Sequence, residues 1–323
     1  MAGGYIGRKL LQAMATILAI VILNFVLFRA MPGSPERVLL RNPNISAAAK
    51  AEIRAQWGLD EPLPVQLVSY LGATAQGDLG YSFKYRGQPV LDVLGSRFWP
   101  TVILFGLGQL IAVVVGIALG AYSGWKRGGV ADYVGNGISL IFYSAPYFII
   151  GMVLLVVFAS MLGWFPTAGM SSLGVRHATL ADELIDFGRH LFLPLTAVAI
   201  GLIGQYSILM RASIVETLGD DYVTTARAKG LRDGYVLRAH ALPNAILPTA
   251  SLVAINIGYV VAGAITVEVV FNWPGLGTLT VEALSARDFP VLQGIFLLLS
   301  VAVVLANLVA DLIYGVLDPR VRA

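Results

Sequence analysis

Long apolar segments recur along the chain, and each is long enough to cross a lipid bilayer as a helix. A transmembrane helix needs about 20 predominantly apolar residues, because an α-helix rises about 1.5 Å per residue and the hydrocarbon core is about 30 Å thick. Segments of this length cover residues 10–30, 99–122, 133–161, 191–210, 245–270 and 291–314. We therefore predict an all-α integral membrane protein with six transmembrane helices.

The overall composition supports this class of protein. Hydrophobic residues make up 57% of the chain and charged residues 13%, whereas soluble globular domains carry about 25% charged residues. The net charge of +3 is too small and too scattered to indicate a nucleic-acid partner. The chain has no cysteine, which excludes disulfide bonds, cysteine lipidation and thiolate metal clusters.

Basic residues outside the spans predict the orientation of the chain. Short cytoplasmic loops of membrane proteins are enriched in Lys and Arg. With six spans and both termini in the cytoplasm, the cytoplasmic side carries Arg8, Lys9, Lys126, Arg127, Arg211, Arg227, Lys229, Arg232, Arg238, Arg320 and Arg322. The short loops on the other side carry Arg176, Arg189 and Arg287. We therefore expect a multi-pass protein with both termini cytoplasmic.

The chain divides into four predicted parts. Residues 1–30 form the cytoplasmic N-terminus and the first transmembrane helix, and residues 317–323 form a cytoplasmic tail. Residues 31–98 are rich in Pro and Gly, and Ser46–Trp57 within them is predicted to form a short helix. Their apolar side chains need burial, which favours a small folded extracytoplasmic insert over a disordered linker. Residues 99–316 form a transmembrane core with five helices.

One long polar stretch with mixed charges, residues 220–243, interrupts the apolar segments. The carboxylate of Asp220 or Asp221 can cap a first short helix, because it suits the free amides and the dipole at a helix start. Gly230 can end that helix, because glycine enters the left-handed conformation without strain.

A second short helix follows in the same stretch. We expect Asp233 to cap it and the helix to reach Leu242, just before Pro243. The stretch is basic, so the two helices are predicted to form a folded hairpin on the cytoplasmic side, available to a partner protein.

The stretch resembles the coupling motif of bacterial ABC-importer permeases, in which Glu-Ala-Ala is followed by three residues, Gly, nine residues and Ile-x-Leu-Pro. The matching residues are Ala226, Gly230, Leu242 and Pro243, and the departures are Thr224, Thr225 and His240. The run Thr-Ala-Arg-Ala-Lys-Gly-Leu, from Thr225 to Leu231, resembles the peptide and nickel subfamily of these permeases. The resemblance implies that the ATPase-coupling residues are Thr224, Thr225, Ala226, Arg227, Ala228, Lys229, Gly230, Leu242 and Pro243.

Other stretches resemble the same subfamily. The runs GLDEPLPVQLVSYL and GDLGYSF resemble the insert that follows the first span of its first permease. The run VEVVFNWPGLG resembles the signature Val-Glu-x-x-Phe-x-x-Pro-Gly-Leu-Gly, and the tail around Asp318-Pro319-Arg320 resembles the cytoplasmic ending. The signature implies residues that shape the external mouth, namely Phe271, Pro274, Gly275 and Gly277.

Polar groups in the spans are candidates for a pathway or a gate. Tyr143 and Ser144 precede Pro146, which should kink the third span, so they lie either on a pathway or at a mere packing bend. Asn256 could face a pathway or form a structural hydrogen bond between helices. Glu268 qualifies because an acid near the membrane usually faces protein or water. The full set of candidates is Tyr143, Ser144, Asn256, Tyr259 and Glu268.

Small residues recur at every fourth position in two spans. The members of the two seams are Ala112, Gly116, Gly120 and Gly124 in the second span, and Ala250, Ala254, Gly258, Ala262 and Thr266 in the fifth. Small residues on one face allow helices to approach closely within a membrane. We therefore predict close helix packing along both seams.

Common sequence motifs of nucleotide-binding and catalytic sites are missing. The chain has no Gly-x-x-x-x-Gly-Lys-Ser/Thr loop, no His-Glu-x-x-His and no Gly-x-Ser-x-Gly. The predicted external loop at residues 162–190 contains His and acidic residues, but their spacing fits no compact metal-ligand motif. We predict no catalytic residue, no metal site and no cofactor bound by this chain. By the resemblance, ATP and Mg are bound by partner ATPase subunits.

The resemblance implies a permease subunit with the type I ABC importer fold. Such a subunit forms half of the translocation pathway for di- or oligopeptides across the bacterial inner membrane, in an ATP-driven, binding-protein-dependent importer. The implied partners are a second homologous permease, two cytoplasmic ATPase domains on one or two chains, and an extracytoplasmic solute-binding protein. Nickel or another small solute remains an alternative cargo. An autonomous secondary carrier or an intramembrane enzyme is an alternative of a different class, which the missing motifs and the lack of inverted repeats disfavour.

Overall fold

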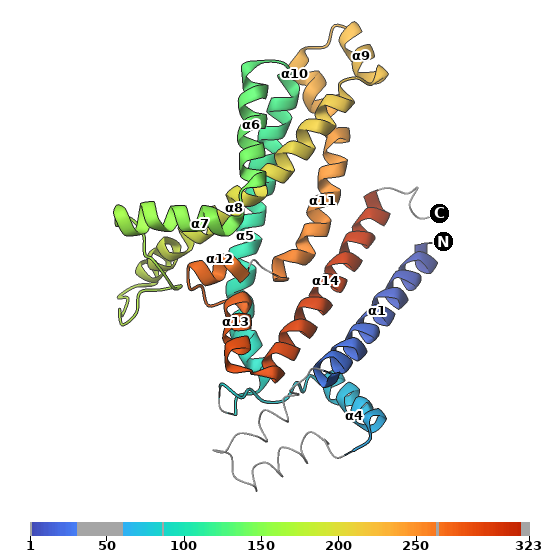
Figure 1. Cartoon of the computed structure of the whole chain (residues 1–323). Helices are drawn as coiled ribbons and strands as arrows, with labels where there is room; N and C mark the ends of the chain where they lie inside the picture. Colours follow the sequence, from blue (N-terminus) through green and yellow to red (C-terminus); the bar gives the residue numbers. More distant parts are fainter. Residues whose placement is uncertain (1, 31–60, 86, 263–264, 318–323) are drawn as a thin grey trace. The chain divides into compact units, whose positions relative to one another are not determined.

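The computed structural model describes residues 2–30, 61–85, 87–262 and 265–317. The regular elements of these residues are helices, which Figure 1 shows from α1 near the N-terminus to α14 near the C-terminus. Contacts divide the chain into a first unit, residues 1–99 with 279–323, and a second unit, residues 100–278. The predicted helix at Ser46–Trp57 and the Asp318-Pro319-Arg320 tail lie outside the described residues.

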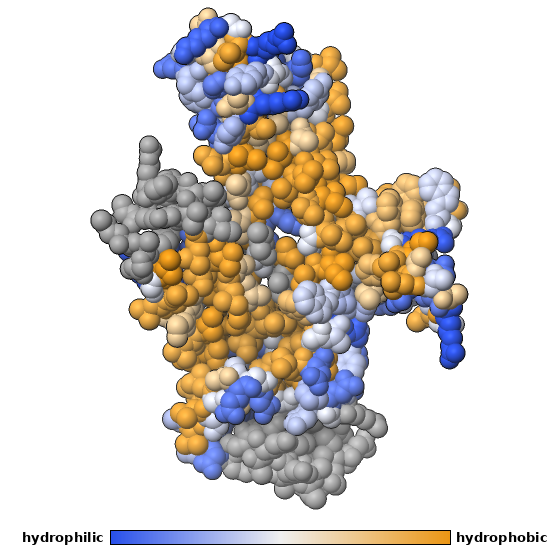
Figure 2. Space-filling view, turned by 180° about the vertical axis from the view of Figure 1, so that it is seen from behind, coloured by the Kyte–Doolittle hydropathy of each residue, from blue (hydrophilic) through white to orange (hydrophobic). Residues whose placement is uncertain are grey.

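Several described helices are long and apolar enough to cross a membrane. Four pass on their own: Ile6–Arg29 of α1 (Ala2–Ala30), α5 (Val90–Trp125), α8 (Leu180–Thr217) and Phe289–Val309 of α14 (Phe289–Leu317). A fifth candidate is the bent pair of α6 (Val130–Ser144) and α7 (Tyr147–Leu154), which the π-helical η1 (Leu155–Met161) extends. The predicted all-α membrane architecture is confirmed, and apolar residues cover much of the face in Figure 2.

Within the described residues, the helices that qualify as spans by length and composition are fewer than the six predicted. Among the described residues, four helices qualify, or five if the bent pair counts as one span. The predicted fifth span, residues 245–270, contains α11 (Leu242–Ala262) and α12 (Ile265–Val270), which are not among these candidates.

In the first unit, α1 packs along α14 and also contacts α4 (Leu63–Ala75). The side-chain amide of Asn24 donates to the carbonyl oxygen of Gln293 at 3.1 Å and to the hydroxyl of Tyr70 at 3.4 Å. Towards the other end of α1, Lys9 and Asp311 form an ion pair at 2.8 Å. Polar contacts near both ends therefore fix how the first predicted span lies along the last one.

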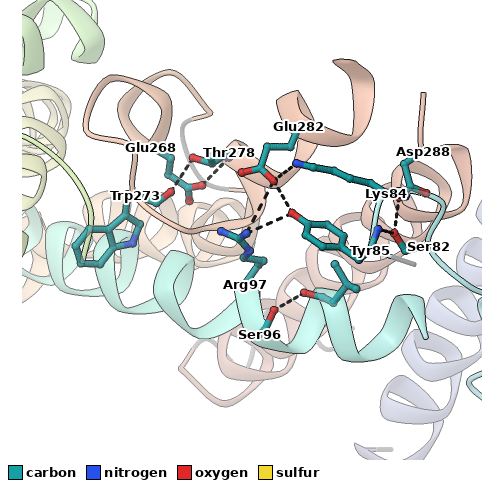
Figure 3. Close-up of polar contacts among 11 residues, drawn as sticks. Ser82, Lys84, Tyr85, Ser96, Arg97, Glu268, Trp273, Thr278, Glu282 and Asp288 are labelled. Carbon is teal, nitrogen blue, oxygen red and sulfur yellow. Dashed lines mark hydrogen bonds and ion pairs between the residues drawn. The ribbon is translucent and has the colours of Figure 1, made fainter. Parts of the chain in front are cut away.

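The described part of the predicted insert is folded against the C-terminal segment of the same unit. Ser82 Oγ donates to the buried carboxylate of Asp288 at 2.5 Å, and the backbone amide of Lys84 donates to the same oxygen at 2.9 Å. Lys84 Nζ and the Tyr85 hydroxyl donate to Glu282 Oε2 of α13 (Leu276–Ala286) at 2.6 and 2.5 Å. Figure 3 shows these groups meeting on the two carboxylates. A loop of the insert is thus held by two acids that flank the start of α14.

Acid pH is expected to loosen this loop from α13. Burial raises the pKa of the Glu282 carboxyl, but the hydrogen bonds from Lys84 and Tyr85 outweigh it and hold that pKa below its ordinary value. The ion pair therefore stabilises the loop above the ordinary pKa of Glu, about 4.3. This contribution is lost as the pH falls through the lowered pKa. Hydrogen exchange of the Ser82 and Gln88 amides, which donate to carbonyl oxygens within the loop, measures the effect.

The size of this effect is limited because the pair is partly exposed. An exposed ion pair contributes at most about 1 kcal/mol, so protection of these amides should fall by at most about fivefold between about pH 7 and about pH 3. Glu282→Gln is the control, because it removes the titrating group and leaves the Ser82–Asp288 contact in place. If acid lowered hydrogen-exchange protection equally in the wild type and in Glu282→Gln, the Lys84–Glu282 ion pair would not be the cause of the effect.

In the second unit, the seam predicted on the second span packs against α8. A Cβ on Gly116 would lie 2.6 Å from Tyr206 Cβ, and a Cβ on Gly124 would lie 2.9 Å from the carbonyl oxygen of Arg211. No side chain fits at these distances, so the two helices approach through their backbones, as the seam predicts. The second seam is partly used within the same unit, because Ala254 is buried and α11 also packs against α8.

The third predicted span is broken at Pro146. α6 ends at Ser144, α7 begins at Tyr147, and their axes differ by 98°. Proline lacks the amide donor that a continuing helix needs, and Ala145 and Pro146 adopt extended conformations. The bend predicted at Pro146 is therefore confirmed, but it is a break between two helices and not the predicted kink within one helix.

Two helices begin before the spans that were predicted on them. Residues 180–190 were predicted to belong to an external loop, but α8 already begins at Leu180. Thr179 and Asp182 form a capping box, in which each side chain accepts a hydrogen bond from the other residue's backbone amide. α5 likewise begins at Val90, before the predicted start of the second span at Trp99. Polar composition suggested loops here, whereas local capping and turn contacts allow the helices to extend.

Candidate functional site

The polar stretch at residues 220–243 begins with the predicted first helix, α9 (Asp221–Ala228). Gly230 follows it with a φ of 78°, and its amide donates to the carbonyl oxygen of Arg227 at 2.9 Å. The predicted helix end at Gly230 is confirmed, because this left-handed conformation favours glycine. Asp220 holds the N-cap position, but its side chain forms no capping hydrogen bond, so that part of the prediction is wrong.

The second half of the stretch differs from the prediction. α10 (Asp233–Val236) continues through the π-helical η2 (Leu237–Ala241) into α11, so the helix does not stop before Pro243. Arg232 holds the N-cap position that was predicted for Asp233. Pro243 is tolerated because it follows the wider turn of η2, where the amide of Leu242 bonds to the carbonyl oxygen of Leu237 and regular α-helical bonding is already interrupted.

This hairpin has a buried side and an exposed side. Val223, Ala226 and Val236 are buried and pack with Leu218 at the end of α8. The predicted coupling residues that are exposed are Thr224, Thr225, Arg227, Ala228, Lys229, Gly230 and Pro243, while Leu242 is half-buried. Figure 2 shows polar residues gathered at the end of the second unit that carries the hairpin. Most of the predicted coupling residues therefore lie where a partner can reach them.

Polar contacts hold the hairpin to its neighbours in the second unit. The guanidinium carbon of Arg227 lies 5.5 Å from the ring centroid of Trp125, the last residue of α5. Arg227 Nε also lies 3.7 Å from Asp233 Oδ1 across the hairpin. The side-chain amide of Asn244, on α11, donates to the Tyr222 hydroxyl at 3.0 Å. These contacts and the apolar core join the hairpin to α5 and α11.

The VEVVFNWPGLG run folds around a buried carboxylate. Glu268 is fully buried and accepts hydrogen bonds from Thr101 Oγ1 at 2.7 Å, from the amide of Gly277 at 2.7 Å and from the amide of Thr278 at 3.1 Å. Figure 3 shows the carboxylate pointing at Thr278. A Cβ on Gly275 would collide with this carboxylate, so the glycine leaves room for it. Glu268 thus anchors its own loop.

The residues predicted to shape an external mouth belong to the same packed loop. Phe271, Gly275 and Gly277 are buried and Pro274 is half-buried. Trp273 Nε1 donates to the carbonyl oxygen of Pro100 at 2.9 Å, and the amide of Gly169 donates to the carbonyl oxygen of Phe271 at 2.9 Å. The loop therefore joins the predicted second span to the segment after α7, and its role at an external mouth stays a prediction.

The predicted pathway residues lie in different environments. Tyr143 and Ser144 are exposed at the end of α6, beside the break at Pro146. Asn256 donates to the Tyr206 hydroxyl at 2.7 Å, which is the structural interhelical bond that the sequence left open. Tyr259 lies on α11, but its side chain is outside the described part of the chain. Glu268, the remaining candidate, is buried against Thr101, Gly277 and Thr278.

Sequence reasoning missed an ion pair between Asp132 on α6 and Arg211 on α8. In the sequence, Arg211 indicates only the cytoplasmic side. The available signal was an acid just before the third predicted span and a base just after the fourth. A charged residue near the membrane usually faces protein or water, so each predicted a polar environment but neither identified the other as its partner.

In the part of the chain that the structure describes, no group of three or more His, Asp or Glu side chains is arranged to hold a metal ion. Asp186 contacts the two histidines of the predicted external loop. Asp186 accepts hydrogen bonds from the amide and hydroxyl of Ser172 at 2.7 and 2.6 Å, with His177 and His190 at 3.3 and 3.5 Å from its oxygens.

Comparison with known proteins identifies the family. Residues 116–323 match the binding-protein-dependent transport system inner membrane component, and residues 4–105 match the N-terminal part of such membrane components. The chain belongs to this family. The two matches together contain the hairpin, the Glu268 loop and the described part of the insert.

Relatives of this permease match over nearly their whole length. A putative peptide permease protein of Brucella ovis is 40% identical over 98% of both chains. The glutathione transport system permease protein GsiC of Salmonella choleraesuis is 36% identical over 98% of both chains. The oligopeptide transport system permease protein AppB of Bacillus subtilis is 34% identical over 98% of this chain and 99% of its own. The predicted membership of the peptide and nickel type of ABC-importer permeases is thus confirmed.

A solved structure shows the same fold. A chain of the methionine ABC transporter MetNI, in an inward-facing conformation, superposes with a TM-score of 0.56 and covers 70% of this permease and 96% of its own length. Its sequence is 17% identical, so the likeness concerns the fold alone. The predicted fold of an ABC-importer permease is confirmed.

Proposed function

We propose that this permease forms half of the translocation pathway for peptides in an ATP-driven importer of the bacterial inner membrane. Relatives named for peptide, oligopeptide and glutathione transport support peptides as the cargo. A second homologous permease completes the pathway, and an extracytoplasmic solute-binding protein delivers the peptide. ATP and Mg²⁺ bind to two cytoplasmic ATPase domains on one or two partner chains. Both termini lie in the cytoplasm, in keeping with the distribution of Lys and Arg.

The observation that carries the proposal is the geometry of the hairpin. Its predicted coupling residues are mostly exposed, while its buried side and its contacts with Trp125 and Asn244 fix it to the helices. A partner that holds this surface can therefore move the helices as a body. ATP can favour one conformation only by stabilising it more than the other, so the ATP-bound partner must hold the hairpin more tightly in one state.

Isolation of the assembly tests the proposed function. The tagged permease is purified gently from its own membranes, and native mass spectrometry identifies its partners and any ligand on a co-purified binding protein. A second permease, ATPase domains and a peptide-loaded binding protein would support the proposal. A nickel-loaded binding protein would overturn the cargo, and a transport-active chain without an ATPase would overturn the importer.

Charge reversal on the exposed side of the hairpin is expected to weaken ATPase binding. Lys229 is exposed on the hairpin, so Lys229→Glu changes the surface with little effect on the fold. We expect the dissociation constant of the ATPase to rise at least about tenfold, which corresponds to about 1.4 kcal/mol. Arg176→Glu, also exposed but on the predicted opposite side, is the matched control and should leave this constant unchanged. Equal binding by both variants would contradict docking on the hairpin.

A further inference from the structure

A single carboxylate joins the ends of three helices in the second unit. Asp132, in the first turn of α6, accepts hydrogen bonds from Arg211 on α8, from Nε at 2.5 Å and from Nη2 at 2.9 Å. The same carboxylate accepts from Ser123 Oγ on α5 at 3.0 Å and from the amide of Gly128 in the following turn at 3.0 Å. The side chain of Asp132 is only 6% exposed. The four donors hold its carboxylate in place.

This joint lies between the hairpin and α6. α8 runs on from Arg211 to the base of the hairpin, where Leu218 is part of the hairpin's apolar core. On the other side, Arg227 of the hairpin lies over Trp125 at the end of α5. A displacement of the hairpin is thus imposed on the ends of α5 and α8, and both of these ends are bonded to Asp132.

α6 can carry that displacement towards the break at Pro146. It packs closely on α8, with Ser139 Oγ donating to Ser207 Oγ at 2.7 Å. Its far end carries Tyr143, one of the predicted pathway residues. A two-point Arg–carboxylate contact fixes orientation as well as distance, which the single ammonium of a lysine does not.

We propose that the Asp132–Arg211 pair is a positioning pair that makes α6 move with α8 and the hairpin, so that ATPase movement reaches the break between α6 and α7. The proposal rests on the proposed function, because it needs an ATPase on the hairpin. It adds a specific route within the permease. A pair that only stabilised the fold would not alter how many peptides are moved for each ATP hydrolysed.

Distance measurements in the assembled wild-type importer give the first test. The chain has no cysteine, so spin labels can be placed at introduced cysteines once any partner cysteines are replaced. Glu216→Cys on α8 and Ile141→Cys on α6 are exposed and lie on the two helices that should move together. We expect one narrow distance distribution that is unchanged between the ATP-free and ATP-bound states. A shift between the two states would overturn the proposal whatever the variants do.

Arg211→Lys gives the second test, because it keeps the charge and removes the two-point contact. We expect the assembled variant to hydrolyse ATP, to show a broadened distance distribution, and to transport at least about fivefold fewer peptides per ATP. Asp311→Asn, which removes the ion pair with Lys9 in the other unit, is the matched control and should keep the wild-type ratio. A wild-type ratio in Arg211→Lys would overturn the proposal.

The charge-swapped protein Asp132→Arg/Arg211→Asp separates coupling from folding. It should recover part of the transport per ATP that each single change removes, because it restores an opposite-charge pair at the joint. Failure of the wild-type assembly to bind an ATPase or to transport peptides would overturn the proposed function itself. An assembly that binds the ATPase and transports peptides, yet is indifferent to these changes, would overturn only the link through Asp132 and Arg211.

Discussion

Glu268→Ala is expected to destabilise the permease by at least about 3 kcal/mol. The change removes the acceptor of three hydrogen bonds from a fully buried place, so Thr101 Oγ1 and the amides of Gly277 and Thr278 lose their shared partner. Each buried donor left without a partner costs about 1–3 kcal/mol. The missing side chain also leaves a cavity in the loop, which adds to the cost. The free energy of unfolding in mixed micelles measures the sum.

Two further variants define the cause. Glu268→Gln keeps one carbonyl acceptor but presents an amide donor to the backbone amides, so we expect a loss between those of wild type and Glu268→Ala. Glu216→Ala, at an exposed acid in the last turn of α8, should change the free energy of unfolding by less than about 0.5 kcal/mol. If Glu268→Ala lay within about 1 kcal/mol of wild type, the carboxylate would not be the anchor of the loop.

The role of Glu268 shows where sequence reasoning was limited. An acid beside an apolar span predicts contact with protein or water, and the sequence left a pathway role open. The spacing of Gly275 and Gly277 relative to Glu268 was the signal for its buried position. A Cβ on Gly277 would lie 2.7 Å from Ile265 Cα and 2.9 Å from Glu268 Oε2. Gly275 and Gly277 therefore leave space for the carboxylate, and the amide of Gly277 donates to it, which residue type alone does not reveal.

Local signals were predicted well. Pro146 and Gly230 each change the backbone through their own covalent structure, and both breaks lie where the sequence placed them. Continuation of the helix past Pro243 was missed, because η2 interrupts the hydrogen bonding before the proline. The pairing of Asp132 with Arg211 was missed because it joins residues that are distant in the sequence and meet only when α6 packs on α8. A contact between residues that are distant in the sequence can be predicted only once the packing of the helices is known.

Gly120→Ala is expected to destabilise the permease by about 1–3 kcal/mol, although alanine favours helices. A Cβ at this position would lie 2.8 Å from Met210 Cβ and 3.0 Å from the backbone nitrogen of Arg211, and still closer to the carbonyl oxygen of Ser207. Two of these three neighbours are backbone atoms of α8, which cannot move aside as a flexible side chain can. The helices must separate, and the loss of packing exceeds the gain of about 1 kcal/mol in helix propensity.

Gly106→Ala on the same helix is the matched control for this seam. A Cβ at Gly106 meets only Val260 Cγ1 at 3.9 Å, an ordinary contact, so helix propensity should act alone. We expect Gly106→Ala to be neutral or stabilising by up to about 1 kcal/mol. The difference between the two variants in the free energy of unfolding isolates the contact between α5 and α8 from propensity. Equal effects would mean that α5 does not approach α8 through Gly120.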